Sequence, residues 1–146
     1  RTPYLFLGYL NESNKIEEPI LNDGYFLTGD IASYNEESTT LFIEARKKEI
    51  IKKGGFLINL KEIELVALKE EFVLGAAAIP ISHDFYGESY NLYLEFKNEC
   101  KSDSIRLSTE KHIHERLDKY KWPDQIKYIN DMPRSPSGKI LKHLLK

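Results

Sequence analysis

The feature that most constrains the fold is an apolar stretch at residues 73–81, which contains Pro80 near its end. This stretch is far shorter than the roughly 20 apolar residues of a membrane helix. A short apolar run that ends at a proline predicts a mostly buried β-strand. Residues 92–96, Leu-Tyr-Leu-Glu-Phe, alternate as a second strand would, and residues 126–129 form a third short run. Three strands are therefore expected in this part of the chain.

Two helices are expected around these strands. Asn59, followed three residues later by Glu62, resembles a capping box, and apolar side chains then recur at helical spacing through about residue 71. Ser108 is expected to cap a second helix. The apolar positions of that helix are Ile113, Leu117 and Tyr120. From residue 47 onward the sequence predicts an α+β domain, with a small three-stranded sheet flanked by helices.

The part before residue 47 has a different pattern. Residues 22–24, Asn-Asp-Gly, indicate a turn. Residues 31–34 and 41–43 flank a polar segment and are predicted to pair as a hairpin. The chain begins without an initiator Met, so we expect a fragment of a longer protein. We divide it into a short β-rich segment at 1–46 and an α+β domain at 47–146.

Composition excludes several classes of protein. The 146 residues carry 21 Lys and Arg against 23 Asp and Glu, a net charge of −2. A dedicated nucleic-acid binder would need a clear basic excess for its phosphate contacts, so we expect no nucleic-acid partner. The sequence has no run long enough to span a membrane, and its first residues lack the pattern of a signal peptide, so we expect neither. The single cysteine, Cys100, excludes an internal disulfide framework and indicates the reducing cytoplasm.

The tail contains Gly138 followed by Lys139, which resembles the end of a phosphate-binding P-loop. That motif also needs a glycine five residues earlier and Ser or Thr immediately after the lysine. Pro133 and Ile140 occupy those positions, so a Walker A site is excluded. Residues 135–138, Ser-Pro-Ser-Gly, lack the strand–turn–helix context of a nucleophilic serine.

Few other residues suggest chemistry. His112 and His114 are two residues apart, so on a helix they face different directions and cannot share a metal ion. What remains is Lys139 on its loop, Asp30 in a Thr-Gly-Asp turn, and a basic segment at residues 46–53 that precedes two glycines. Taken one at a time, each of these features is weak evidence of function. An ordinary turn residue explains Asp30, and solvated surface cations explain Lys139 and residues 47–53.

Their order along the chain resembles a known family, the adenylate-forming enzymes. Residues 25–30, Tyr-Phe-Leu-Thr-Gly-Asp, resemble its Tyr-x-x-Thr-Gly-Asp motif, and residues 46–56 resemble its hinge motif. Residues 84–88 resemble its Asp-x-x-x-Gly-Glu loop, and residues 120–123 are similar to its Tyr-Lys-x-Pro. Residues 133–140 match its C-terminal catalytic-lysine motif almost letter for letter. The resemblance runs from about residue 8 to the last residue, and its wording is most like that of an acyl-CoA synthetase.

The resemblance implies an activity. Enzymes of this family join a carboxylic acid to ATP, release pyrophosphate, and transfer the acyl group of the acyl-AMP to a thiol such as coenzyme A. By the family's pattern, Lys139 is the catalytic lysine of the first step and Lys48 is the hinge residue. Asp30 would bind the ribose hydroxyls of ATP, and Arg46 would contact ribose or phosphate.

The same pattern assigns the second step. Gly54 and Gly55 would lie on the pantetheine side of coenzyme A, and Lys52 would assist thiol transfer. The loops that hold triphosphate, Mg²⁺ and the acid belong to a large N-terminal domain absent from this sequence, so the chain alone is expected to be inactive. Residues 1–46 would be the end of that domain. One departure from the pattern is Ala45, where the family usually has glycine.

Two other functions stay open. The acyl group could be transferred to the phosphopantetheine of a carrier protein instead of coenzyme A. Alternatively, the chain could be a binding module that reuses the fold without chemistry. The intact Lys139 and Asp30 argue against a binding module, because such a module needs neither residue.

Overall fold

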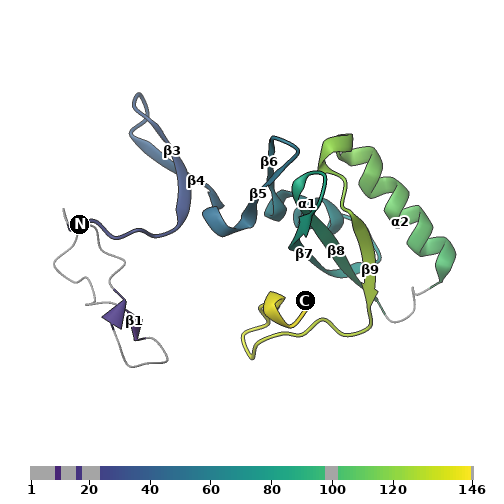
Figure 1. The fold of residues 1–146 in the computed structure, drawn as a ribbon. Helices are drawn as coiled ribbons and strands as arrows, with labels where there is room; N and C mark the ends of the chain where they lie inside the picture. The colour runs from purple at the N-terminus through teal and green to yellow at the C-terminus, as the bar shows by residue number, and fades with distance from the viewer. Residues whose placement is uncertain (1–8, 11–15, 18–23, 98–101, 146) are drawn as a thin grey trace. The chain divides into compact units, whose positions relative to one another are not determined.

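The structure is a computed structural model that describes residues 9–10, 16–17, 24–97 and 102–145. Residues 22 and 23 of the expected turn, and Cys100, lie outside the described residues. The chain separates into two compact units, residues 1–48 and residues 49–146. Figure 1 labels the elements of both.

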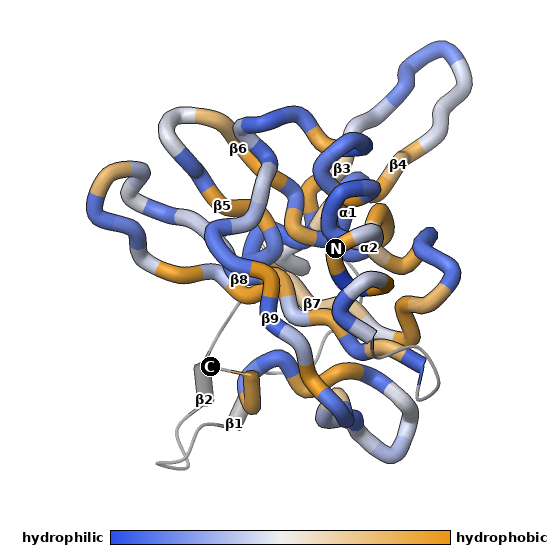
Figure 2. Tube along the Cα trace, turned by 90° about the vertical axis from the view of Figure 1, so that its right-hand side faces the viewer, coloured by the Kyte–Doolittle hydropathy of each residue, from blue (hydrophilic) through white to orange (hydrophobic). Residues whose placement is uncertain are grey.

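The described strands of the first unit form two β-ribbons. Strand β1 (Tyr9–Leu10) pairs antiparallel with β2 (Ile16–Glu17). Strand β3 (Asp30–Asn35) pairs antiparallel with β4 (Thr40–Arg46) around a turn whose colouring runs from hydrophilic to near neutral (Figure 2). The predicted hairpin is therefore confirmed, and it extends beyond the predicted strands at both ends. The extra residues place Asp30 directly opposite Arg46.

The second unit is built on a five-stranded sheet. Its strands are β5 (Ile50–Lys53), β6 (Phe56–Asn59), β7 (Val73–His83), β8 (Gly87–Phe96) and β9 (Gln125–Ile129). Strand β8 pairs antiparallel with β7 along its whole length and antiparallel with β5 at one residue pair. It pairs parallel with β9. The three predicted strands are present as β7, β8 and β9.

The prediction of three strands was wrong, because the sheet has five. The two strands that were not predicted form the hairpin β5–β6. Its first strand contains two lysines, and the sequence there looked like a solvated basic segment. Alternation explains the strand, because Ile51 of β5 and Ile58 opposite it on β6 are buried, while Lys52 next to Ile51 is exposed. Strand β7 also continues past Pro80 to His83. Pro80 is tolerated because β7 is an edge strand, where a missing N–H breaks no ladder.

The helices follow local capping chemistry. Helix α1 (Leu60–Ala67) begins as predicted at Asn59, whose Oδ1 accepts a hydrogen bond from the Lys61 N–H at 3.0 Å. Helix α2 (Asp103–Arg116) is capped by Ser102, so the prediction of a cap at Ser108 was wrong by six residues. Short 3₁₀ turns follow as η2 (Lys119–Lys121) and η3 (Lys142–Leu145). Within the described residues, no helix is long and apolar enough to cross a membrane.

The sheet has a core on each face. Helices α1 and α2 cover one face (Figure 1), where Ile63 and Ile113 pack against Leu92 and Leu94 of β8. The C-terminal segment covers the other face, where Met132 and Leu145 pack against the opposite side of β7. In Figure 2, hydrophobic segments occur along β7, β8 and β9. The segment that carries Lys139 is thus fixed to the sheet on both sides of its turn.

Candidate functional site

The segment around Lys139 forms a tight turn. Arg134 and Ile140 make an antiparallel bridge, and the Ser135 N–H donates to the Lys139 carbonyl at 2.8 Å. The Gly138 N–H donates to the Ser135 carbonyl at 2.8 Å, and Gly138 has a φ of +82°, which favours glycine. The Lys139 side chain is exposed and makes no ion pair with any residue that the structure describes. The backbone therefore holds the base of Lys139 while its ammonium stays available.

An arginine fastens the start of this turn to the sheet. Arg134 forms an ion pair with Glu95, whose side chain is only 7% exposed. The other carboxylate oxygen of Glu95 accepts a hydrogen bond from the Met132 N–H at 3.1 Å. Gly75 lies directly beside the pair, because a Cβ built there would be 2.7 Å from both the Arg134 Nη2 and the Glu95 Oε2. A glycine at this position of β7 thus leaves room for the ion pair.

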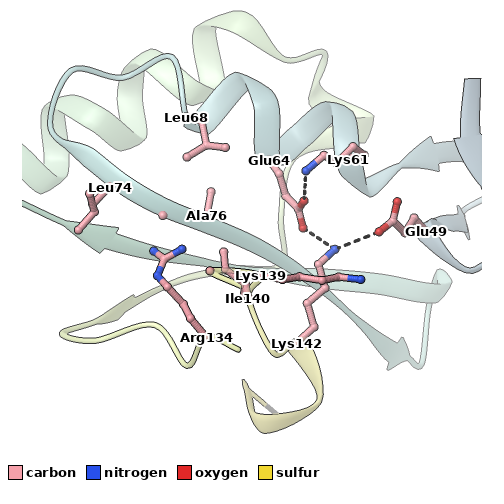
Figure 3. Close-up of a pocket in the computed structure, with 12 residues that line it drawn as sticks. Glu49, Lys61, Glu64, Leu68, Leu74, Ala76, Arg134, Lys139, Ile140 and Lys142 are labelled. Atoms are coloured by element: carbon pink, nitrogen blue, oxygen red, sulfur yellow. Dashed lines mark hydrogen bonds and ion pairs between the residues drawn. The ribbon is translucent and has the colours of Figure 1, made fainter. Parts of the chain in front are cut away.

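A lysine fastens the end of the turn. The Lys142 ammonium is 2.6 Å from Glu64 Oε1 and 3.6 Å from Glu49 Oε1 (Figure 3). Glu64 is 3% exposed and also accepts from the Ala78 N–H at 3.0 Å. Lys142 and its two carboxylate partners line a pocket of about 350 Å³ together with Arg134 and Lys139. The pocket therefore brings Lys139 close to residues on β7, on α1 and just after the boundary between the units.

In the first unit, the structure brings Asp30 and Arg46 together. The Arg46 Nε is 2.8 Å from Asp30 Oδ1, and its Nη1 donates to the Thr28 carbonyl at 2.9 Å. Gly29 has a φ of +75°, and its carbonyl accepts from the Lys47 N–H at 2.8 Å. The turn before β3 and the end of β4 are thus held as one polar corner that carries a carboxylate and a guanidinium.

Lys48, the expected hinge residue, lies in the 3₁₀ turn η1 (Lys47–Glu49) and is exposed. It is the last residue of the first unit, and Glu49 is the first residue of the second. Only a short 3₁₀ turn therefore stands between β4 and β5.

Gly54 and Gly55 form the turn of the β5–β6 hairpin. Their φ values of +55° and +93° are the signs that a type I′ turn requires at its two central residues. The Gly54 N–H donates to the Tyr86 carbonyl at 3.1 Å, and a Cβ on Gly54 would be 3.1 Å from the Tyr86 ring. The turn itself thus requires both glycines, independently of any ligand.

The two lysines before this turn differ. Lys52 is exposed, and its backbone N–H donates to Glu88 at 2.6 Å. Lys53 donates from its ammonium to the Trp122 carbonyl at 2.6 Å, and its burial lowers its pKa. Lys52 is therefore the lysine of this pair that is open to solvent.

The Tyr-Lys-Trp-Pro segment packs beside the same turn. The Tyr120 ring stacks on Phe56 with centroids 4.6 Å apart, and the two line a pocket with Gly54. The Lys121 ammonium is 2.7 Å from Glu62, and this hydrogen bond raises the pKa of Lys121. The motif regions of the second unit thus surround two pockets, one beside Lys139 and one beside Gly54.

Sequence reasoning missed the buried carboxylates Glu64 and Glu95. A signal for Glu64 is present, because Leu60, Ile63 and Ala67 define the buried face of α1 and Glu64 lies within it. A carboxylate on an apolar helix face needs a partner, since burying an unpaired charge is costly. Glu95 alternates with apolar residues like any solvent-facing strand residue, so its burial could not be read from the pattern.

Metal binding has no support in this geometry. No group of three potential side-chain ligands occurs among the residues that the structure describes. These residues do not fit a Mg²⁺ site of their own.

Comparison with known proteins identifies the relatives of the chain, although no family model matches it. The medium-chain fatty-acid–CoA ligase of Escherichia coli K12 is 32% identical over 146 residues, which is all of this chain and 26% of that ligase. The 4-coumarate–CoA ligase 1 of Glycine max is also 32% identical over 146 residues, 49% of its length. The chain is a relative of the C-terminal part of adenylate-forming acyl-CoA ligases.

The fold agrees with this relationship. The crystal structure of ATP-bound MatB from Rhodopseudomonas palustris superposes on 99% of the chain with a TM-score of 0.78 and 27% identity. The match covers 28% of that protein. The predicted fold, an α+β C-terminal domain of adenylate-forming enzymes preceded by a β-rich segment, is thereby confirmed. The chain spans about a quarter to a half of the length of these relatives.

Proposed function

We propose that the protein to which this chain belongs is an ATP-dependent acid–thiol ligase that forms an acyl-AMP and transfers the acyl group to coenzyme A. The identity to CoA ligases along the entire chain supports this activity. The observation that carries the proposal is the turn at residues 134–140. It offers an exposed Lys139, which has no ion pair within the described part of the chain, from a backbone fixed by buried carboxylates.

In the first step, a carboxylate oxygen of the acid attacks the α-phosphorus of ATP, and the bond to pyrophosphate breaks. Two anions approach each other, and negative charge develops on the phosphoryl oxygens. The Lys139 ammonium offsets the repulsion and stabilises that charge. Removing one such preorganised donor typically lowers the rate by about 10²–10³-fold.

Asp30 and Arg46 have roles in binding ATP. An ionised carboxylate has enough lone pairs to accept hydrogen bonds from two ribose hydroxyls. Arg46 contributes a planar fork of donors suited to ribose or phosphate oxygens. Their ion pair supports this assignment, because each side chain holds the other in one orientation before the nucleotide arrives.

In the second step, the thiol sulfur attacks the acyl carbon, AMP leaves with the bonding electrons, and the thiol proton passes to solvent or a base. Rotation at Lys48 would withdraw Lys139 and present the Gly54–Gly55 turn to the pantetheine arm. The open backbone of the two glycines favours close approach by the arm. Lys52, the exposed lysine beside this turn, assists the transfer.

Residues 1–46 belong, in this proposal, to the end of a large N-terminal domain that binds the acid and the triphosphate with Mg²⁺. Support comes from the β3–β4 hairpin, because four of its large apolar side chains are more than half exposed. These are Tyr34, Leu41, Phe42 and Ile43. A lone two-stranded ribbon is at best marginally stable in water, so these side chains need a partner surface.

Residues 47–146 form the lid of the enzyme in this proposal. The single Cys100 supports a place in the reducing cytoplasm.

The test is carboxylate-dependent ATP–pyrophosphate exchange by the full-length protein, measured across a panel of acids. Exchange with one class of acid is expected, and Lys139→Ala should lower it about 10²–10³-fold. The matched control is Lys111→Ala, which removes an exposed lysine from α2. Coenzyme A and a phosphopantetheinylated carrier protein are then compared as acceptors. No exchange with any acid, or full exchange by Lys139→Ala, would contradict the proposal.

A further inference from the structure

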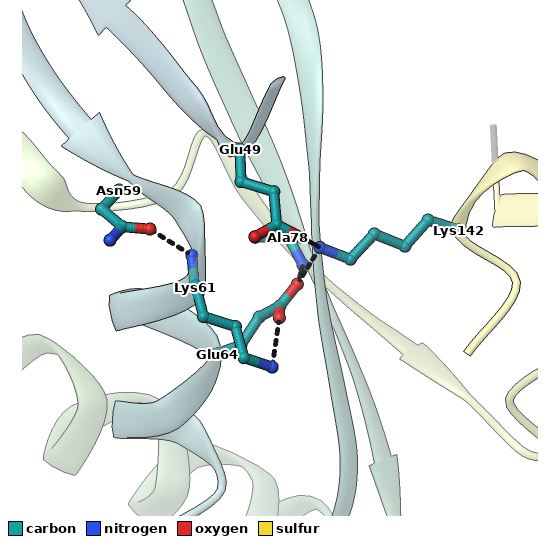
Figure 4. A network of polar contacts seen from close by, with 6 residues as sticks. All are labelled: Glu49, Asn59, Lys61, Glu64, Ala78 and Lys142. Atoms are coloured by element: carbon teal, nitrogen blue, oxygen red, sulfur yellow. Dashed lines mark hydrogen bonds and ion pairs between the residues drawn. The ribbon is translucent and has the colours of Figure 1, made fainter. Parts of the chain in front are cut away.

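One ammonium group, that of Lys142, lies between two carboxylates from distant parts of the second unit (Figure 4). Glu64 comes from α1, and Glu49 comes from the 3₁₀ turn η1 at the boundary between the units. We refer to Lys142 with these two carboxylates as the Lys142 bridge. It joins three segments that lie far apart in the sequence.

The two contacts of the bridge differ in strength. Glu64 is 3% exposed, and its oxygens accept from Lys142 at 2.6 Å, Lys61 at 3.3 Å and the Ala78 N–H at 3.0 Å. A buried carboxylate with this many donors is held in place, and so is the ammonium it pairs with. Glu49 is 26% exposed and 3.6 Å from Lys142, so its contact is the weaker one.

The position of the bridge matters for Lys139. Lys142 follows Lys139 by three residues, and the Leu141 N–H between them donates to the Pro133 carbonyl at 2.8 Å. That bond closes the turn that carries Lys139. The bridge therefore fixes the closed end of this turn to Glu49, which directly follows Lys48 in the chain.

We propose that Lys142 is a positioning residue that makes the Lys139 turn and the start of the second unit move as one body. The inference rests on the proposed function for its assay. A rotation at Lys48 moves the second unit from its first residue, Glu49. The Lys142 ammonium contacts Glu49, and Lys142 itself directly follows the Lys139 turn. The rotation therefore moves Glu49, Lys142 and the Lys139 ammonium together.

This role predicts an effect on one half-reaction only. Lys139 acts in adenylation, so looser positioning should lower the kcat of that step while the KM for ATP changes little. Misplacement of a catalytic group by about 1 Å can cost as much as 10²-fold in rate. Transfer from acyl-AMP supplied ready-made does not use Lys139 and should keep its rate. A lysine that only stabilised the fold would affect both half-reactions through the amount of folded enzyme.

The experiment uses the full-length protein and measures both half-reactions, with thermal unfolding as a check of folding. Lys142→Met should lower the kcat of pyrophosphate exchange by about 10-fold or more, and Lys142→Arg should restore most of it because a guanidinium can pair with the same carboxylates. The matched control is Lys111→Met, which breaks the exposed 3.7 Å pair with Glu115 on α2.

A second variant keeps the test valid if Lys142→Met folds poorly. Glu49→Gln leaves the buried pair of Lys142 with Glu64 intact, so the fold should hold. Its loss of exchange should be roughly 2- to 5-fold, as expected for a partly exposed ion pair. The control is Glu115→Gln. Equal losses in exchange and thiol transfer, or no loss in either variant, would overturn the proposal while wild-type exchange still supported the proposed function.

Discussion

Gly75 offers a way to break the Arg134–Glu95 ion pair without removing either charge. In Gly75→Ala, the new Cβ would lie 2.7 Å from the Arg134 Nη2 and from the Glu95 Oε2. Ordinary van der Waals contact begins at 3.4 Å, so the ends of both side chains must move away from the new Cβ, which disturbs their ion pair. The substitution therefore tests whether a glycine in β7 is needed for the pair that fastens the Lys139 turn.

The magnitude follows from two opposing effects. A hydrogen bond to a charged group contributes roughly 1.5–3 kcal/mol, and the lower end applies because Arg134 is 34% exposed. Alanine also restricts the unfolded chain, which stabilises the fold by about 0.4–1 kcal/mol. The free energy of unfolding of Gly75→Ala should therefore fall by about 1 kcal/mol, which corresponds to a fall in Tm of about 4–8 °C for a unit of this size.

The assay is thermal unfolding of the chain as Gly75→Ala, Arg134→Met and the double variant. The two substitutions disturb one ion pair, so their costs should not add, and alanine should cost less where Arg134 is already gone. If Gly75→Ala raises the Tm, or if the two costs are simply additive, the structural role given to Gly75 is wrong.

Two further predictions concern the β5–β6 turn and the tyrosines Tyr90 and Tyr128. Gly54→Ala and Gly55→Ala should each destabilise the chain by about 1–2 kcal/mol, because both φ values are positive. In urea unfolding, Tyr86→Ala should relieve part of the cost at Gly54 and none at Gly55, and equal relief at both would count against the close approach of the Tyr86 ring to Gly54. Burial raises the pKa of Tyr90 and of Tyr128 above the usual value near 10. Since the unfolded chain releases these phenol protons first, the free energy of unfolding should fall as pH rises above about 10. The double variant Tyr90→Phe/Tyr128→Phe should show a flatter fall, and an unchanged slope would contradict the assignment.

The sequence predicted the parts of the fold that local patterns specify. The strands at residues 73–81, 92–96 and 126–129 and the Asn59 cap depend on runs and spacings within a few residues, and all are present. The second helix was misplaced because Ser102 and Ser108 are equally good caps locally. The choice between them depends on how α2 packs on the sheet through Ile113, which a local pattern does not contain.

In the candidate site, too, the sequence identified residues in local motifs and missed those defined by long-range contacts. The motif residues Asp30 and Arg46 could be named from the sequence, and the β3–β4 pairing brings them together. Glu64 and Lys142 could not be assigned, because their importance comes from contacts between segments that lie far apart in the chain. The contact of Lys142 with Glu49, for example, is set only by the tertiary fold. The roles of the site residues are proposals that the two half-reactions test.

The outer edge of β7 has a consequence for association. An exposed strand edge offers free N–H and C=O groups to which another chain can add. Here the Ala78 N–H is already bound by Glu64, and Pro80 has no N–H to offer. A foreign strand would therefore find no continuous ladder along this stretch, so the sheet is protected there against edge-to-edge aggregation.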